Sequence, residues 1–280
     1  MVAISPFRHL EDRLEAAGKH GTVSLWWGDL VGARFSRNAD VPHYAASTMK
    51  LPLVIAVLRK AARGEIVLAA PVEVHNSFSS AADGSTYSVD PAEDQDPGTW
   101  SALEHGTTRS VLQLCDHAIT HSGNLAANIL LEMVGLDEIA HVLHAAGCST
   151  QTVVRRGIED TKAREAGITN TVTAADLGRL MVSLARHDTA LGGAPVCAPV
   201  EAMLSRSQIR NQIPAGLPPD VSTANKTGWV DGVSHDVCLI RPVDREPVVL
   251  SICTTTDLSE TAAAALVASL AKDVWQVFTG

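Results

Sequence analysis

The chain opens with apolar residues at helical spacing and then changes to an alternating pattern. Phe7, Leu10, Leu14 and Ala17 recur every three or four positions, which predicts a helix over residues 6–18 that ends at a glycine. The following run, GTVSLWWGDLVGARFSRN, holds two strand-like segments separated by a Gly-Asp pair, which favours a tight turn. These patterns predict a helix followed by a β-hairpin.

Helical periodicity dominates the middle of the chain, and strand-like runs dominate the last third. A helix is predicted from Ser47 to about Ala62, and helical patterns continue over most of residues 107–187. One more helix is expected after Pro199. Three strand-like runs and a closing helix follow it, at residues 222–230, 234–242, 246–256 and 260–278.

The order of these elements predicts an α/β fold. It indicates one antiparallel sheet that is flanked by helices and built from both chain termini, with an inserted all-helical domain. We expect the α/β sheet domain to comprise residues 1–50 and 190–280, and the helical domain residues 51–189, within one continuous catalytic unit. The cleft between the two parts is the expected site of chemistry.

Composition and charge restrict the class of protein. With 280 residues, of which 46% are hydrophobic and 19% charged, the chain can bury a full core. A net charge of −9 gives no indication of a surface for nucleic acid. Apolar runs such as residues 51–58 are too short to span a bilayer, and charges from Arg8 to Glu15 interrupt any signal-peptide pattern. With five scattered cysteines, we predict a cytoplasmic protein, although a secreted chain that had lost its leader would look similar.

Residues 76–99 are rich in Ser, Asp, Gly and Pro and follow no period, so they predict a long loop. Loops of this length are often lids over a site. The five acidic residues of this segment instead favour a disordered surface insertion, which is the hypothesis we prefer. Trp100, just after the loop, either walls a pocket or packs in the core.

Two residues at the start of the second predicted helix suggest nucleophilic catalysis. Ser47 lies at the helix N-terminus, where backbone N–H groups favour negative charge, and Lys50 lies one turn later on the same side. A lysine with a lowered pKa can take the serine proton at neutral pH. The alternative is that Ser47 caps the helix while Lys50 extends to solvent. Because Ser269 and Lys272 repeat the S-x-x-K spacing inside the closing helix, spacing alone is weak evidence.

Two further motifs supply partners for this pair. A Ser-Gly-Asn run at residues 122–124 separates two apolar helical stretches, and a Lys-Thr-Gly run at residues 226–228 lies in a strand-like segment. Together with Ser47 and Lys50, they resemble the S-x-x-K, S-D-N and K-T-G motifs of class A β-lactamases and penicillin-binding proteins, with Gly123 in place of Asp. The stretches LAANILLEMVG, TNTVTAADLGRLM and PVVLSICTTT extend the resemblance to these penicillin-recognising serine hydrolases over most of the chain.

The resemblance implies a set of catalytic roles. Ser47 would attack a carbonyl group and form an acyl-enzyme, with Lys50 as the activating base. Ser122 would relay a proton to the leaving group. Lys226 would poise that hydroxyl and attract a substrate carboxylate.

The resemblance also implies residues that bind the substrate. Thr227 would donate a hydrogen bond to the substrate carboxylate. The backbone N–H groups of Ser47 and of Trp229, which follows Gly228, would form the oxyanion hole. Asn124 would orient the lysine base or a substrate amide.

Two interpretations remain open for the residue that removes the acyl group. Class A β-lactamases use an omega-loop glutamate, usually two residues after an arginine, to position a water molecule. Counting from Arg156 gives Ile158, and the nearest acid is Glu159. A shift of one residue assigns deacylation to Glu159. The alternative, which we favour, is a loop glutamate in an ion pair with Arg155 or Arg156.

The resemblance therefore implies a serine hydrolase that acts through acyl-Ser47 on an amide, ester or β-lactam carbonyl. Two alternatives remain: a penicillin-binding sensor or pseudo-enzyme without turnover, and an intracellular acyltransferase. The expected partner is a small molecule or short peptide with a carbonyl, and in some cases a carboxylate. No nucleic acid, membrane or cofactor is expected.

A metal site is also not expected. His117 and His121 have the spacing of a metal pair on a helix, but the sequence offers no third ligand. We interpret them as residues of a helix surface.

Overall fold

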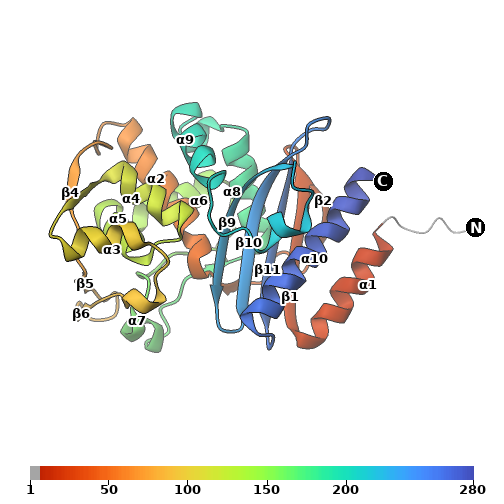
Figure 1. Cartoon of the computed structure of the whole chain (residues 1–280), viewed down its shortest axis with the longest axis horizontal. Helices are drawn as coiled ribbons and strands as arrows, with labels where there is room; N and C mark the ends of the chain where they lie inside the picture. Colours follow the sequence, from red (N-terminus) through yellow and green to blue (C-terminus); the bar gives the residue numbers. More distant parts are fainter. Residues whose placement is uncertain (1–6) are drawn as a thin grey trace, which may run out of the picture.

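The computed structural model describes residues 7–280 and contains one five-stranded sheet with helices on both faces (Figure 1). Every pairing in this sheet is antiparallel, and the strand order is β2-β1-β11-β10-β9. The first two strands therefore join the last three, as the sequence predicts for a sheet made from both chain ends. The strands are β1 (Gly21–Asp29), β2 (Ala33–Arg37), β9 (Ser222–Val230), β10 (Val233–Arg241) and β11 (Val248–Thr256).

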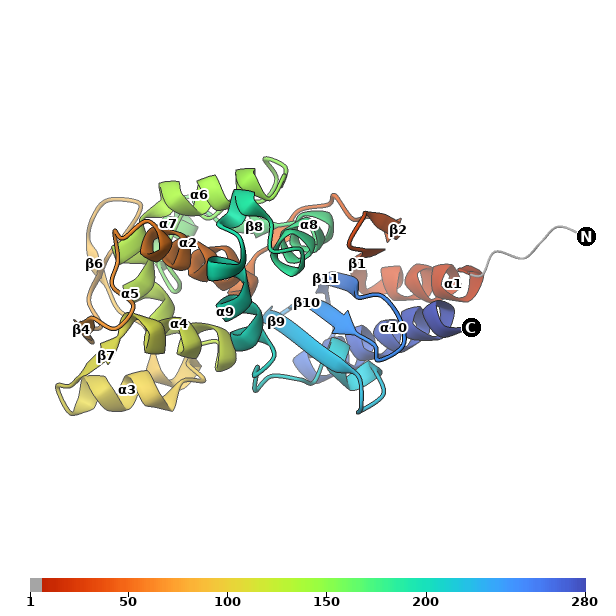
Figure 2. The same cartoon turned by 90° about the horizontal axis from the view of Figure 1, so that it is seen from above.

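Two helices from opposite ends of the chain cover one face of the sheet (Figure 2). These are α1 (Arg8–Ala17) and α10 (Glu260–Thr279). Leu25 and Trp27 point toward them and join a core with Leu14 and Leu270. Because neighbouring strand residues face opposite sides, Trp26 belongs to the core on the other face.

The other face carries α8 (Ala174–Ala185) and, beyond it, a unit of helices. The remaining helices are α2 (Lys50–Ala62), α3 (Pro97–Glu104), α4 (Val111–Thr120), α5 (Asn124–Val134), α6 (Leu136–Ala145), α7 (Thr161–Glu165) and α9 (Ala194–Leu204). Short two-stranded pairs join β3 (His43–Tyr44) to β8 (Thr171–Val172), β4 (Pro71–Glu73) to β7 (Thr108–Ser110), and β5 (Phe78–Ser79) to β6 (Thr86–Tyr87).

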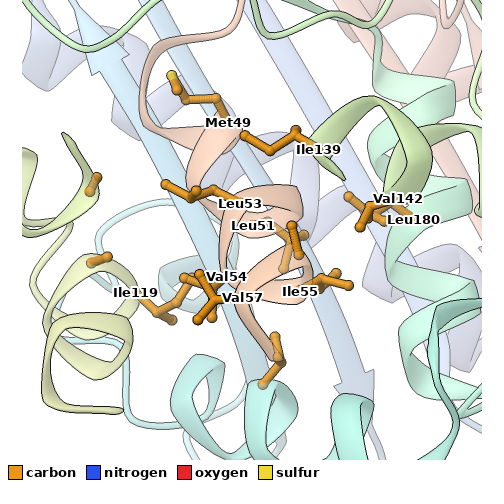
Figure 3. Close-up of a cluster of buried hydrophobic side chains, with 14 of the residues drawn as sticks. Met49, Leu51, Leu53, Val54, Ile55, Val57, Ile119, Ile139, Val142 and Leu180 are labelled. Atoms are coloured by element: carbon orange, nitrogen blue, oxygen red, sulfur yellow. The ribbon is translucent and has the colours of Figure 1, made fainter. Parts of the chain in front are cut away.

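Helix α2 is the central element of the helical unit. Its residues 50–58 are all buried, as expected for a helix that is hydrophobic on every side. Figure 3 shows Leu51, Val54 and Ile55 of this helix among side chains from α4, α6 and α8. This packing fixes the first turn of α2 and, with it, the 3-10 turn Ala46–Met49 that precedes the helix and carries the candidate nucleophile.

The structure confirms the predicted fold class and the order of the main elements. The α8 helix, which falls inside the predicted helical domain, packs against β1, β10 and β11. The domain limits at residues 50, 51, 189 and 190 stay a prediction. Within residues 7–280, no helix has the length and apolarity needed to cross a membrane. All five cysteines are free thiols, and four of them are buried.

The preferred hypothesis for residues 76–99, a disordered insertion, is wrong. The segment contains β5, β6, a 3-10 turn at Pro91–Glu93 and the beginning of α3. Two of its carboxylates, Asp94 and Asp96, accept hydrogen bonds from the ends of helices. Composition suggested a solvated acidic loop, but backbone N–H groups at helix N-termini satisfy these carboxylates.

Two histidines are buried where β3 meets the sheet. His43 hydrogen-bonds to Thr255 at 2.8 Å and Ser24 at 2.9 Å, and His235 to the Tyr44 carbonyl at 2.8 Å. Their rings lie 5.4 Å apart, edge to face. Protonating either ring would place a charge in the protein interior.

We expect acid to destabilise the fold through this pair. Burial lowers the pKa of both His43 and His235 from 6.5 to about 4, so the unfolded chain binds protons that the folded chain excludes. The stability that they contribute is complete above pH 6.5 and falls between pH 6.5 and 4. The loss should reach about 3 kcal/mol per histidine. Urea unfolding at about pH 7 and about pH 4.5 measures it.

A His43→Asn variant should lose less stability between these two pH values than the wild type does. His105 is exposed, so His105→Gln should leave the loss unchanged. If His43→Asn kept the entire wild-type loss, the buried histidines would not be its source.

Candidate active site

Ser47 lies in a 3-10 turn, Ala46–Met49, that leads directly into α2. The residues at the cap positions of the turn and the helix are Ala45 and Met49, so Ser47 is not the helix cap. The Lys50 side chain is fully buried rather than extended to solvent, and its Nζ lies 2.9 Å from Ser47 Oγ. Both parts of the cap-and-solvent alternative are therefore wrong.

The environment of Lys50 suits a general base. Its Nζ donates to the Ser122 carbonyl and, at 2.7 Å, to Asn124 Oδ1. Burial lowers the Lys50 pKa to about 7, against the opposing effect of nearby carboxylates, chiefly Asp94 and then Glu159. A substantial fraction of Lys50 is therefore neutral at physiological pH and able to accept a proton.

Ser122 lies at the junction of α4 and α5, where two lysines approach one hydroxyl. Lys226 Nζ donates to Ser122 Oγ at 2.9 Å, and Lys50 Nζ lies 3.4 Å from the same atom. Burial, followed by the charge of Lys50, lowers the Lys226 pKa well below its usual value, while Asp236 opposes this effect. The arrangement connects Ser47, Lys50, Ser122 and Lys226 by hydrogen bonds.

Three residues in or beside this network have left-handed backbones, which are costly for residues other than glycine. Ala46 has φ 44°, Ser122 φ 59° and Glu159 φ 64°. Such strain persists only where the surrounding structure imposes it, and it gathers at functional sites. The backbone at these positions therefore supports the assignment of the site.

Strand β9 passes directly over the turn that carries Ser47. A Cβ at Gly228 would lie 2.9 Å from the Ser47 nitrogen and 2.8 Å from the Thr48 nitrogen, so only glycine allows this approach. Trp229 lines the same cavity as Ser47. Thr227 Oγ1 is buried, and it has no hydrogen-bond partner among the described residues.

Glu159 faces the same site from the loop before α7. Its Oε1 accepts from Asn124 Nδ2 at 3.1 Å, and its Oε2 accepts from the Asp90 N–H at 2.7 Å. Burial raises the Glu159 pKa, although both hydrogen bonds oppose the rise. Within residues 7–280, Glu159 contacts Asp90 and Asn124 and forms no ion pair with Arg155 or Arg156. The favoured ion-pair hypothesis is therefore wrong.

These side chains border a cavity of about 720 Å³ between the edge of the sheet and the helical unit. Ser47, Ser122, Asn124, Glu159 and Trp229 all line it. The buried amines of Lys50 and Lys226 reach this lining through Ser47 and Ser122. The other lining residues are Tyr44, Ala46, Ala92, Glu93, Gln95, Arg156, Ile158, Asp160, Thr161, Arg164, Val230, Asp231 and Glu260.

Sequence reasoning missed the contribution of the acidic loop. Asp94 Oδ1 accepts from the Asn124 N–H, and its Oδ2 accepts from the Leu125 N–H, both at 2.9 Å, so this carboxylate holds the first turn of α5. Trp100 Nε1 donates to the same carboxylate, and its ring packs against the core rather than lining the cavity. The Asp96-Pro97 pair was an available signal for the cap of α3, whereas Asp94, which precedes Gln95, carried no such signal.

The candidate metal pair does not form. His117 Nδ1 instead lies 2.9 Å from Asp96 Oδ1, and the His117 and His121 rings contact each other. No group of three or more His, Cys, Asp or Glu residues is placed to hold a metal ion in the described part of the chain.

The antiparallel sheet, the helical unit and the serine–lysine pair between them define a β-lactamase-like serine hydrolase. The sequence model of the beta-lactamase enzyme family matches residues 8–278. The chain therefore belongs to the beta-lactamase enzyme family.

Curated relatives and solved structures agree with this assignment. Beta-lactamase AST-1 of Nocardia asteroides is 32% identical over 60% of this chain, an alignment that spans 54% of the relative. A beta-lactamase of Streptomyces fradiae is 29% identical over 80% of this chain and 70% of its own length. A beta lactamase structure from Xanthomonas campestris has a TM-score of 0.84 at 21% identity, covering 99% of this chain and all of that one. At this identity the structural match shows the shared fold.

Proposed function

We propose that the protein hydrolyses a carbonyl compound, a β-lactam in the first instance, through a covalent acyl-Ser47 intermediate. The observation that carries the proposal is the 2.9 Å contact between Lys50 Nζ and Ser47 Oγ, combined with a Lys50 pKa of about 7. A hydroxyl beside a buried, partly neutral amine is an activated nucleophile.

Acylation proceeds through successive steps in which the residues of the hydrogen-bonded network act one after another. Neutral Lys50 takes the Ser47 hydroxyl proton while Oγ attacks the carbonyl carbon. The backbone N–H groups of Ser47 and Trp229 stabilise the resulting oxyanion. Ser122 then delivers a proton to the leaving nitrogen or oxygen, and Lys226 holds its hydroxyl in position.

Deacylation needs a base on the same cavity, and Glu159 is the best candidate. The Glu159 carboxylate activates a water molecule that attacks the acyl-Ser47 carbonyl. Asn124 supports this role because it connects Lys50 to Glu159 through its two side-chain atoms. This connection favours turnover over a sensor or pseudo-enzyme that keeps its acyl group.

The expected substrate is a small molecule or short peptide that bears a carboxylate near its carbonyl. The buried, unpartnered Thr227 hydroxyl and the amine of Lys226 support recognition of that carboxylate. Relatives named as beta-lactamases make β-lactams the first class to test. A cytoplasmic location remains part of the proposal, and five free cysteines support it.

Intact-mass measurement with benzylpenicillin, a chromogenic cephalosporin and a chromogenic ester tests the function. We expect a transient adduct, followed by release of the hydrolysed product. Ser47→Ala should abolish both. Wild-type protein that showed neither an adduct nor product with any of the three would contradict the nucleophile assignment. A permanent adduct would favour the sensor, and product formed only with an added acyl acceptor would favour the acyltransferase.

Lys226→Ala should slow acylation about 10²-fold, because it removes the amine that donates to Ser122 Oγ. The matched control is Lys272→Ala, which removes an exposed lysine from the second S-x-x-K copy in α10. Adduct formation over time, followed by intact mass, gives both rates. Equal rates for the two variants would contradict the assignment of Lys226.

A further inference from the structure

Asp96 is a buried carboxylate beside the active-site turn. It precedes α3 and accepts from the backbone N–H groups of Gly98 at 3.0 Å and Thr99 at 3.2 Å, as well as from the Thr99 hydroxyl. His117 Nδ1 lies 2.9 Å from its Oδ1. The side chain therefore joins the start of α3 to α4.

The space that Asp96 fills is the space that a side chain at residue 123 would need. A Cβ built on Gly123 would lie 2.8 Å from Asp96 Oδ2 and 2.9 Å from Asp96 Cβ. The backbone of Gly123, with φ −57° and ψ 124°, is open to any amino acid. Glycine is therefore required at this position by Asp96 and not by the backbone.

Asp96 is also connected to the turn through His117. The Gly123 N–H donates to the His117 carbonyl at 3.2 Å, while the His117 ring contacts Asp96. Ser122, the preceding residue, has the strained φ of 59° and must be held by its surroundings. The Asp96 carboxylate provides that support, because it lies against Gly123 and is bound to the start of α3 and to His117 of α4.

We propose that Asp96 is a positioning residue that supplies, from the acidic loop, the carboxylate that S-D-N proteins carry at the position of Gly123. It keeps Ser122 and Asn124 in place for proton transfer and for the contact with Lys50. The kinetic part of this inference rests on the proposed function. The structural part is that the Asp96 carboxylate occupies the space that an aspartate side chain at residue 123 would fill, and this part does not depend on the proposed function.

Exchanging the two positions tests the inference. Asp96→Ala should slow acylation by benzylpenicillin about 30-fold, because the Ser122 turn loosens. Gly123→Asp alone should be at least as impaired, since two carboxylates would compete for one space. The double variant Asp96→Ala/Gly123→Asp should recover to within about threefold of the wild type. Asp83→Ala, which removes an exposed carboxylate of the same loop, should behave as the wild type.

The pH profile separates positioning from a general loss of packing. Asp96 is one of the carboxylates that raise the Lys50 pKa, so Asp96→Ala should move the acid limb of acylation to lower pH. The double variant should move it back. A double variant that was no faster than Asp96→Ala, or a Gly123→Asp variant equal to the wild type, would overturn the inference.

Hydrogen exchange decides the structural part even if the wild type forms no adduct. The amide of residue 123, which donates to the His117 carbonyl, should exchange about tenfold faster in Asp96→Ala and return to near the wild-type rate in the double variant. A wild type that formed neither adduct nor product but showed this pattern would contradict the proposed function and still support the role of Asp96. An unchanged rate of amide hydrogen exchange in Asp96→Ala would overturn the inference whether or not the protein forms an acyl-Ser47 intermediate.

Discussion

A Lys50→Met variant should acylate about 10³-fold more slowly than the wild type, because it keeps the volume of the side chain and removes the base. Lys50 is fully buried and lies 2.9 Å from Ser47 Oγ, and burial brings its pKa to about 7. The neutral amine accepts the Ser47 proton, so the wild-type rate should rise with pH through about 7. Lys50→Met should lose this limb of the profile. Intact-mass time courses with benzylpenicillin at several pH values measure both effects.

The control for Lys50→Met is its fold, because the amine also donates to Ser122 and Asn124. The thermal midpoint and the circular dichroism spectrum should show a folded protein. A folded Lys50→Met that acylated at the wild-type rate and kept the wild-type pH profile would exclude Lys50 as the base. Ser122 or Lys226 would then be the group to test.

Much of the fold could be predicted because each main element has its own periodic signal. Alternating runs at both chain ends predicted one sheet, and β1 does pair with β11. The S-x-x-K spacing alone did not distinguish Ser47 from Ser269. The Ser-Gly-Asn and Lys-Thr-Gly runs made the distinction. In the structure Ser122 contacts Lys50 and Lys226, and Gly228 lies against the backbone of Ser47.

The acidic loop could not be predicted because the interactions that order it are distant in sequence. Asp94 binds N–H groups 30 and 31 residues away, at Asn124 and Leu125. Local composition carries no information about such partners, so the five acidic residues of this segment predicted a disordered, solvent-exposed loop. The same limit applies to Gly123. The Asp96 carboxylate of this loop fills the space beside Gly123, where S-D-N proteins carry an aspartate side chain.

Glu159 could not be assigned by counting because the backbone decides where its side chain points. The expected position was Ile158, and neighbouring arginines suggested an ion pair. The left-handed conformation of Glu159 accompanies its contacts with Asn124 and Asp90 instead. Arg156 takes other partners, the Tyr44 hydroxyl and the Gly157 carbonyl. A sequence offers no signal for a positive φ at glutamate.

Glu159→Gln should separate the two halves of the reaction. Acylation should stay within about threefold of the wild type, whereas deacylation should fall about 10³-fold, because the amide cannot take a proton from water. The adduct on Ser47 should therefore persist in intact-mass spectra. In the wild type, deacylation should fall as pH drops through the Glu159 pKa, which burial places above the usual glutamate value. Product release against pH measures this limb.

Glu165→Gln is the matched control, because Glu165 is an exposed acid of the same segment. It should release product at the wild-type rate. A Glu159→Gln variant that also released product normally would show that another group activates the water. Loss of acylation in Glu159→Gln would give a different conclusion, since Glu159 also holds Asn124 and, through it, Lys50. The residue would then act by holding the base rather than by activating water.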